Sequence, residues 1–224
     1  FIIYNFARMI RDILIRDPFT LIILSLIIVI TFVKYNNQQK FNSFSKIFWN
    51  NYYLKKYKNE KAVYYLFDYF LQLNFIISLS LFIYISNLIY SDIRITYNFI
   101  AIIDVMKVII VFLILKNIAE IGISWFFNIK SLIKLYLNEK INYNNLIGLV
   151  ILCFNIMLIY LFNPNIYIII IMVLTILFLK LVGYSNSFIL HLKTINKSWF
   201  YFILYLCTLE IIPYILLYNF FISL

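Results

Sequence analysis

The sequence contains few of the residues from which most enzyme sites are built. Its 224 residues include one histidine, two cysteines and three widely spaced glycines. A metal centre needs several His, Cys, Asp or Glu ligands, and a phosphate-binding loop or a nucleophile elbow needs clustered glycines. The single histidine, His191, lies in a polar stretch, and Cys153 and Cys207 lie in apolar runs as small hydrophobic residues. We therefore expect no catalytic site, no metal and no cofactor.

Charged residues are scarce as well. They make up 12% of the chain, whereas apolar residues make up 65%, and the mean hydropathy is +0.94. Soluble domains are roughly 45–50% apolar and 25% charged, so this composition excludes an ordinary soluble protein. It predicts a polytopic, all-α membrane protein in one domain, residues 1–224. Because initiating Met and a signal-peptide pattern are both lacking, we expect the natural N-terminus to lie upstream of Phe1.

Six apolar stretches are long enough to cross a bilayer, which takes about 20 helical residues. Polar or turn-forming residues separate them, such as Asn163-Pro164-Asn165 between the fourth and the fifth. We predict transmembrane helices near residues 19–35, 69–90, 99–118, 146–162, 166–182 and 199–221.

The distribution of Lys and Arg predicts the orientation. Connections 34–61, 116–145 and 180–198 hold most of the basic residues. The positive-inside rule therefore places these three in the cytoplasm and both termini outside. Two further segments, residues 1–17 and about 130–138, have polar residues at helical spacing and are predicted as amphipathic interfacial helices, with a new helix starting at Pro18.

Ionisable residues inside the predicted spans are the sharpest candidates for a site. Asp104 and Lys107 lie in the third span, and Glu210 lies at the centre of the last, three residues before the helix-kinking Pro213. Lys107 and Glu210 are expected at similar depth. The cluster can serve as a proton or ion relay, or as a structural clasp or partner contact, and the second alternative is favoured because broken, Gly-rich helices are lacking. Further along, Lys116 and Glu120 are spaced i,i+4.

Connection 34–61 combines seven lysines with many aromatic residues. We expect it to lie against the membrane surface, where topology and attraction to anionic lipid head groups explain the lysines. Docking of a partner protein is the second explanation, and nucleic acid is the least favoured because no RNA-binding motif is present. The residues expected to contact lipid or a partner are Trp49, Lys55, Lys56, Lys58 and Lys61.

Three segments carry a resemblance to a known family. They are Phe200–Phe221, with the pattern LYLCxLExxPYxxLY, Leu132–Asn155, and Phe41–Tyr57, with FxxFxxxFxNNYYLxxY. In these segments the chain resembles a family of uncharacterised multi-pass inner-membrane proteins of Bacteroidota, described as a domain of unknown function. The resemblance implies a bacterial inner membrane and places Glu210 and Pro213 in the family pattern, but it implies no activity.

The sequence favours a non-catalytic subunit of a larger bacterial inner-membrane complex, for example in protein export or envelope assembly. No catalytic motif is present, and almost no chain remains for a soluble domain. We expect other membrane subunits and the lipid bilayer as its partners. The alternative function is a small transporter or proton-coupled channel that uses Asp104, Lys107 and Glu210, and a membrane enzyme ranks third.

Overall fold

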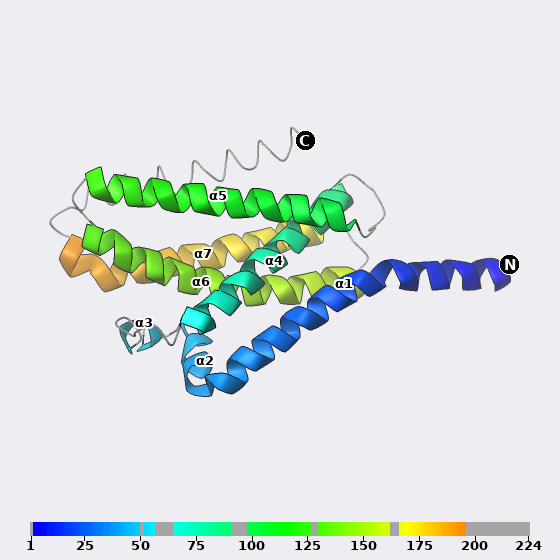
Figure 1. The fold of residues 1–224 in the computed structure, drawn as a ribbon, viewed down its shortest axis with the longest axis horizontal. Coiled ribbons are helices and arrows are strands. Elements are labelled where there is room, and N and C mark those ends of the chain that lie inside the picture. The colour runs from blue at the N-terminus through cyan, green and yellow to red at the C-terminus, as the bar shows by residue number, and fades with distance from the viewer. Residues whose placement is uncertain are drawn as a thin grey trace.

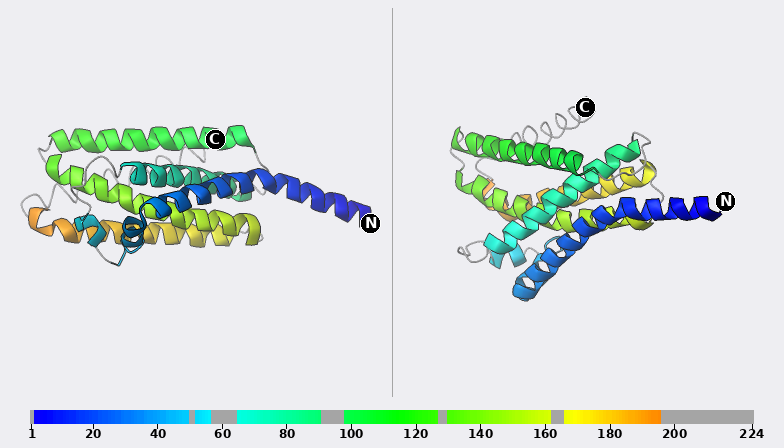
Figure 2. Two further views of the ribbon diagram at one scale, coloured as in Figure 1. Left: turned by 60° about the horizontal axis from the view of Figure 1, so that its bottom comes forward. Right: turned by 45° about the vertical axis from the view of Figure 1, so that its right-hand side comes forward.

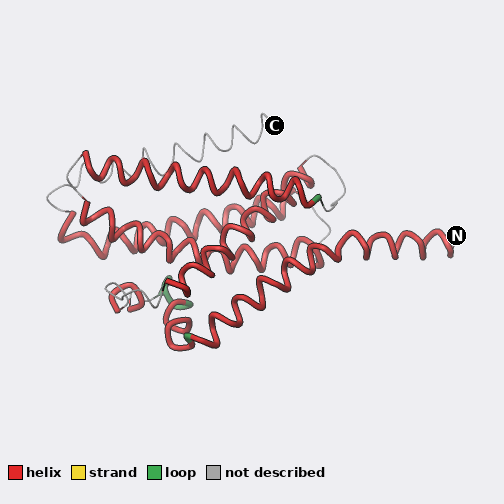
Figure 3. Tube along the Cα trace, in the orientation of Figure 1, coloured by secondary structure: helices red, strands yellow, loops and turns green. Residues whose placement is uncertain are grey.

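The computed structural model describes residues 2–49, 52–56, 65–90, 98–126, 130–161 and 166–195. These residues form helices joined by short connections, and Figure 3 shows no strand among them. The all-α prediction is therefore confirmed for the described part of the chain. The elements, labelled in Figure 1, are α1 (Ile2–Asn36), α2 (Gln38–Phe44), α3 (Tyr52–Lys56), α4 (Tyr65–Tyr90), α5 (Phe99–Phe126), α6 (Lys130–Ile156), the π-helical turn η2 (Met157–Leu161) and α7 (Ile166–Ile195).

Four of the described helical stretches are long and apolar enough to cross a membrane, by length and composition. They are Pro18–Asn36, Leu66–Tyr90, Tyr136–Tyr160 and Ile166–Ser187. The predicted span at 99–118 is helical as part of α5, but α5 is not one of the four, and the predicted span at 199–221 lies outside the described residues. Six spans and two outside termini therefore stay predictions.

Two predicted helix boundaries were wrong. The segment at 130–138 is not a separate surface helix, because α6 runs from Lys130 to Ile156 without a break and its apolar stretch begins at Tyr136 rather than at 146. Likewise, no new helix begins at Pro18, which lies inside the continuous helix α1. Proline leaves one carbonyl of the preceding turn without its donor, and such a position bends a helix without ending it. Figures 1 and 2 show α1 bent, with its first part extending beyond the other helices.

Local sequence signals account for several helix ends and polar side chains. The side-chain oxygen of Asn98 accepts hydrogen bonds from the backbone N–H groups of Ile100 and Ala101, at 3.1 and 3.3 Å, and so caps α5. Inside α4, the Ser80 hydroxyl donates to the backbone oxygens of Ile76 and Ile77 one turn earlier. Such bonds within a helix let a hydroxyl lie in an apolar environment.

Helices α4 and α6 form the main contact of the bundle. In Figure 1, α4 crosses the other helices diagonally. At Gly148 the backbones come so close that an added Cβ atom would lie 2.7 Å from the Cα atom of Phe75 and 2.8 Å from its Cβ atom. Small residues permit this kind of approach between membrane helices. Figure 1 shows that α4 and α6 run in the same direction and that α5, which links them in the chain, runs back alongside them.

The aromatic residues of connection 34–61 are divided between exposed positions, such as Trp49 and Tyr52, and buried ones that were not expected. Phe44 is fully buried, and its ring makes edge-to-face contacts with Tyr53 and Phe67, at centroid distances of 5.5 and 5.8 Å. Ile47 and Leu54 join the same cluster, which packs on the first turns of α4 and on α6. This part of the connection thus forms a second core beside the main one, since burying its large side chains stabilises more than leaving them in contact with head groups.

Candidate functional site

The predicted intramembrane cluster is only partly assembled in the described residues. The Lys107 Nζ atom lies 3.0 Å from the Asp104 Oδ1 atom, and the two side chains are 67% and 59% exposed. They lie on the outward face of α5, where Ile100, Val111 and Ile114 are also exposed. Glu210 and Pro213 lie outside the described residues, so their contact with Lys107 stays a prediction.

The predicted surface residues of the basic connection are described in part. Trp49 is 88% exposed, and the Lys56 ammonium lies 5.5 Å from the centroid of the Tyr52 ring. The side chain of Lys55 and all of Lys58 and Lys61 lie outside the described residues. Their role in lipid or partner contact stays a prediction.

Lys40 of the same connection is buried instead. Its ammonium lies 4.7 Å above the ring of Phe67 and 3.7 Å from the Asp68 Oδ2 atom, and the residue is only 5% exposed. A cation in such a place is stabilised by the ring face and by the carboxylate together. Lys40 therefore ties α2 to the first turns of α4.

A charged cluster that the sequence did not predict lies between α5 and α6. Lys116 and Glu120 come from α5, Lys140 comes from α6, and all three are at least nine-tenths buried. The Lys140 Nζ atom forms an ion pair with the Glu120 Oε1 atom. Lys140 lies four residues inside the apolar stretch Tyr136–Tyr160, roughly 6 Å along the helix at about 1.5 Å per residue. We call Lys116, Glu120 and Lys140 the buried charge cluster.

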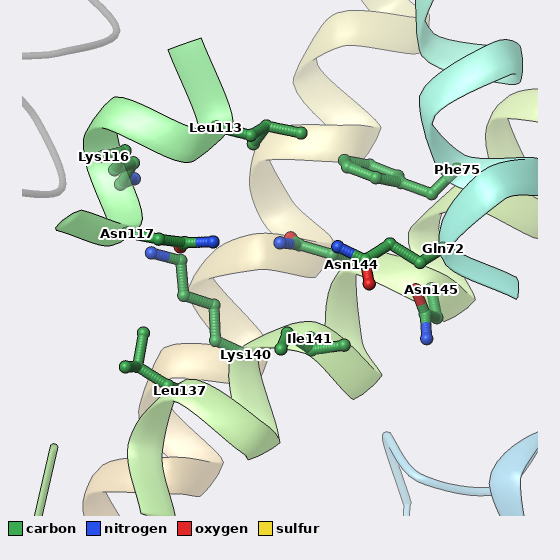
Figure 4. A pocket seen from close by; sticks show the side chains of 10 residues that line it. All are labelled: Gln72, Phe75, Leu113, Lys116, Asn117, Leu137, Lys140, Ile141, Asn144 and Asn145. Atoms are coloured by element: carbon green, nitrogen blue, oxygen red, sulfur yellow. The ribbon is translucent and has the colours of Figure 1, made fainter. Parts of the chain in front are cut away.

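A small pocket with a volume of about 30 Å³ adjoins this cluster. Figure 4 shows its lining: Lys116 and Asn117 from α5, Gln72 and Phe75 from α4, and Lys140 and Asn144 from α6, among others. In this view the side chains of Asn117 and Asn144 point toward each other from opposite walls, and the Lys140 side chain extends toward Asn117. A cavity of this volume holds one or two waters or a small ion.

Polar side chains continue from the pocket along the contact between α4 and α6. The Asn145 amide donates to the backbone oxygen of Asp68 at 3.4 Å, and the Asn155 amide donates to that of Ser78 at 2.8 Å. The two asparagines are ten residues apart, which spans about 15 Å of helix. Gly148 lies between them at the closest approach of the backbones, where no water can enter. These residues therefore lock α4 to α6 and do not form an open path.

The chemistry available to these residues is electrostatic. Among the described residues, no three His, Cys, Asp or Glu side chains come together as a metal site requires. The buried charge cluster can hold water or an ion and can stabilise helix packing. The sequence did contain one signal for it, the i,i+4 spacing of Lys116 and Glu120. The sequence does not indicate that Lys140 belongs to the cluster, because Lys140 lies in the predicted basic connection 116–145.

In the described residues, helices of membrane length pack around a mainly apolar core that also holds a few charged and amide side chains, which defines the class: a helical protein suited to a bilayer. Within this class, the chain belongs to the family described as Domain of unknown function (DUF4271), whose model matches residues 19–221. No curated protein and no solved structure matches the chain. The membership confirms the resemblance to a family described as a domain of unknown function, while the bacterial group and the C-terminal pattern stay predictions.

Proposed function

We propose that the protein is a non-catalytic integral subunit of a larger complex in the inner membrane of Bacteroidota, one that serves protein export or envelope assembly. Its outward α5 face, defined by Ile100, Asp104, Lys107, Val111 and Ile114, is the docking surface for another membrane subunit. The partner presents a transmembrane helix with a polar or charged side chain opposite the ion pair.

The observation that supports this proposal is the exposure of Asp104 and Lys107 on an otherwise apolar face. Helix α5 packs against both α4 and α6, which contain membrane-length apolar stretches. Asp104 and Lys107 lie five and eight residues from the start of α5, roughly 8 and 12 Å along the axis. A charged side chain that faces lipid costs up to about 2.5–3.5 kcal/mol, the insertion-scale value for the centre of a membrane helix, and less near its ends.

A protein partner lowers this cost in a way that lipid does not. It can donate hydrogen bonds to the Asp104 carboxylate and accept them from the Lys107 ammonium, while its apolar residues cover Ile100, Val111 and Ile114. Polar contacts between membrane helices are worth roughly 0.6 kcal/mol each, so several are needed for a stable contact. Because the face offers two charges and three apolar side chains, it suits one crossing helix.

The test is photo-crosslinking in native membranes, followed by purification in mild detergent. A photoreactive residue at Val111 on the α5 face is compared with one at Leu174 on α7, a matched control because the two positions are 54% and 59% exposed. We expect Val111 to crosslink in stoichiometric yield to one other membrane polypeptide and Leu174 to give no such product. Replacing both Asp104 and Lys107 with Leu should abolish that product and the co-purification.

Two outcomes contradict the proposal. A Val111 crosslink within the same chain, for example to residues 199–221, would mean that the protein covers its own ion pair. Purification as an isolated protomer or homodimer with unchanged cell phenotype of the Leu double variant would favour the transporter alternative.

A further inference from the structure

The carboxamide of Asn145 is satisfied at one end only. The residue is fully buried on α6, and its amide nitrogen donates to the backbone oxygen of Asp68 at 3.4 Å. A backbone oxygen only accepts hydrogen bonds, so the nitrogen must be the end that faces Asp68. The other end is therefore the oxygen, Oδ1, which is buried and has no hydrogen-bond partner among the described residues. An unpaired buried acceptor is costly, so the Asn145 oxygen requires a donor.

The small pocket between α4, α5 and α6 adjoins this carboxamide, since Asn145 is one of its lining residues. Three further carboxamides line the pocket, one from each helix: Gln72 from α4, Asn117 from α5 and Asn144 from α6. Figure 4 shows these three groups following one another across the pocket. A carboxamide both donates and accepts hydrogen bonds, so the lining offers a ligand partners of both kinds.

The volume and the chemistry of the pocket together select the ligand. A volume of about 30 Å³ admits one or two waters and excludes nucleotides and sugars. A halide ion has no hydrogen to donate to the Asn145 oxygen. A divalent cation prefers carboxylate ligands, and none is among the described residues that line the pocket. Water suits the site, because it donates to an oxygen and accepts from an amide nitrogen.

We propose that the pocket is a binding site for resident water, which donates a hydrogen bond to the Asn145 Oδ1 atom and is held by the carboxamides of Gln72, Asn117 and Asn144. A buried water with about three hydrogen-bond partners is part of the fold and is costly to remove. Here the partners come from three helices. The water therefore holds α5 against the closely packed pair of α4 and α6.

Radiolytic footprinting of the purified full chain in detergent tests for this water. X-rays convert water into hydroxyl radicals, which oxidise the side chains next to the water from which they form, and mass spectrometry locates the oxidised residues. Phe75 lines the pocket and is 4% exposed, whereas Phe67 on the same helix is 2% exposed and lies outside the lining. Because both are buried phenylalanines of α4, we expect the oxidation of Phe75 to be well above that of Phe67.

Asn145→Leu removes the oxygen that holds the water while keeping a side chain of similar size. We expect the oxidation of Phe75 to fall to the level of Phe67. A variant that merely loosened the helix packing would admit bulk water and raise the oxidation instead. Asn138→Leu makes the same exchange at an exposed position of α6 outside the pocket and should leave the oxidation of Phe75 as in the parent.

Gln72→Leu is a second variant of the lining, needed because Asn145→Leu also removes the hydrogen bond to the Asp68 backbone and can weaken folding. Gln72 is only partly buried, and its replacement keeps that bond, so the same loss of Phe75 oxidation is expected in a folded protein. The proposal is overturned if Phe75 of the parent is oxidised no more than Phe67, or if neither Asn145→Leu nor Gln72→Leu lowers the oxidation of Phe75.

Discussion

Gly148 lies where α6 comes closest to α4, and replacing it with alanine is the most direct test of the packing. The new methyl group would lie 2.7 Å from the Cα atom, 2.8 Å from the Cβ atom and 3.2 Å from the backbone nitrogen of Phe75. Carbon atoms pack at about 3.5–4.0 Å. No rotation of the Phe75 side chain moves these atoms away, so the two helices must separate.

The expected magnitude follows from three contributions. Overpacking a tight contact costs about 1–3 kcal/mol, and a clash with backbone atoms belongs at the upper end of this range. Separation also lengthens the 2.8 Å hydrogen bond from the Asn155 amide to the Ser78 carbonyl, a loss of about 0.6 kcal/mol between membrane helices. Alanine is favoured over glycine in a helix by about 1 kcal/mol, which offsets part of the loss. We expect Gly148→Ala to lower the free energy of unfolding by about 2–3 kcal/mol.

The other two glycines provide matched controls. No heavy atom lies within 4 Å of a Cβ atom added at Gly122, so only the gain in helix propensity remains and the variant should be up to about 1 kcal/mol more stable. At Gly183 the added atom would lie 3.0 Å from the Tyr143 ring, which can shift slightly, so an intermediate value is expected.

The assay is reversible unfolding of the purified protein in mixed micelles with increasing dodecyl sulfate, followed by the loss of helical circular dichroism. The predicted order of stability is Gly122→Ala, then Gly183→Ala, then Gly148→Ala. If Gly148→Ala is as stable as Gly122→Ala, the close approach of α4 and α6 does not exist in the protein.

Further changes test the buried charges and the second core. Glu120→Gln alone leaves the Lys140 ammonium without its carboxylate and should cost about 3–5 kcal/mol in the same unfolding assay, whereas adding Lys140→Met should recover part of that loss; additive effects would contradict the ion pair. Phe44→Ala should cost about 3–5 kcal/mol, while Trp49→Ala, at an exposed position, should stay within about 0.5 kcal/mol; similar values for both would contradict the burial of the aromatic cluster. If residues 199–221 of the same chain cover the α5 face, Glu210→Gln should lower the yield of the purified protein more than Glu210→Gln combined with Lys107→Met, whereas docking of a partner subunit on this face predicts that adding Lys107→Met lowers the yield further.

Hydropathy predicted the apolar helices well because a membrane helix and a buried helix share the same composition. It placed the start of the fourth span at residue 146, although the apolar stretch of α6 begins at Tyr136. The error arises from Glu139, Lys140 and Asn145, which are polar but buried inside the bundle. Interpreting each of these polar residues as solvent-exposed ended the predicted span before them, since their partners lie on other helices and cannot be read from one segment.

The candidate site was predictable only in part, because the sequence indicates contacts within one helix but not contacts between helices. Contacts within one helix follow from spacing, as the i,i+3 ion pair of Asp104 and Lys107 illustrates. The pair of Glu120 and Lys140 spans two helices, so spacing alone gives no reason to join them. The burial of Phe44 in connection 34–61 was missed for a similar reason, because it depends on contact with Phe67 of α4.

The buried charges show which helix ends lie together, while the side of the membrane that these ends face stays a prediction. Lys40 meets Asp68 at the start of α4, and Glu120 meets Lys140 near the end of α5 and the start of α6. The side-chain amide of Asn186 on α7 donates to the Phe48 backbone oxygen at 3.4 Å, which brings the end of α7 to the same end of the bundle. The described parts of the three basic connections therefore lie at one end of the bundle, as connections on a common side of a membrane would. Buried cations near that end of the bundle are close to water during insertion into the membrane. With an alternating topology, their insertion therefore costs less free energy than insertion of charges at the centre of the bundle.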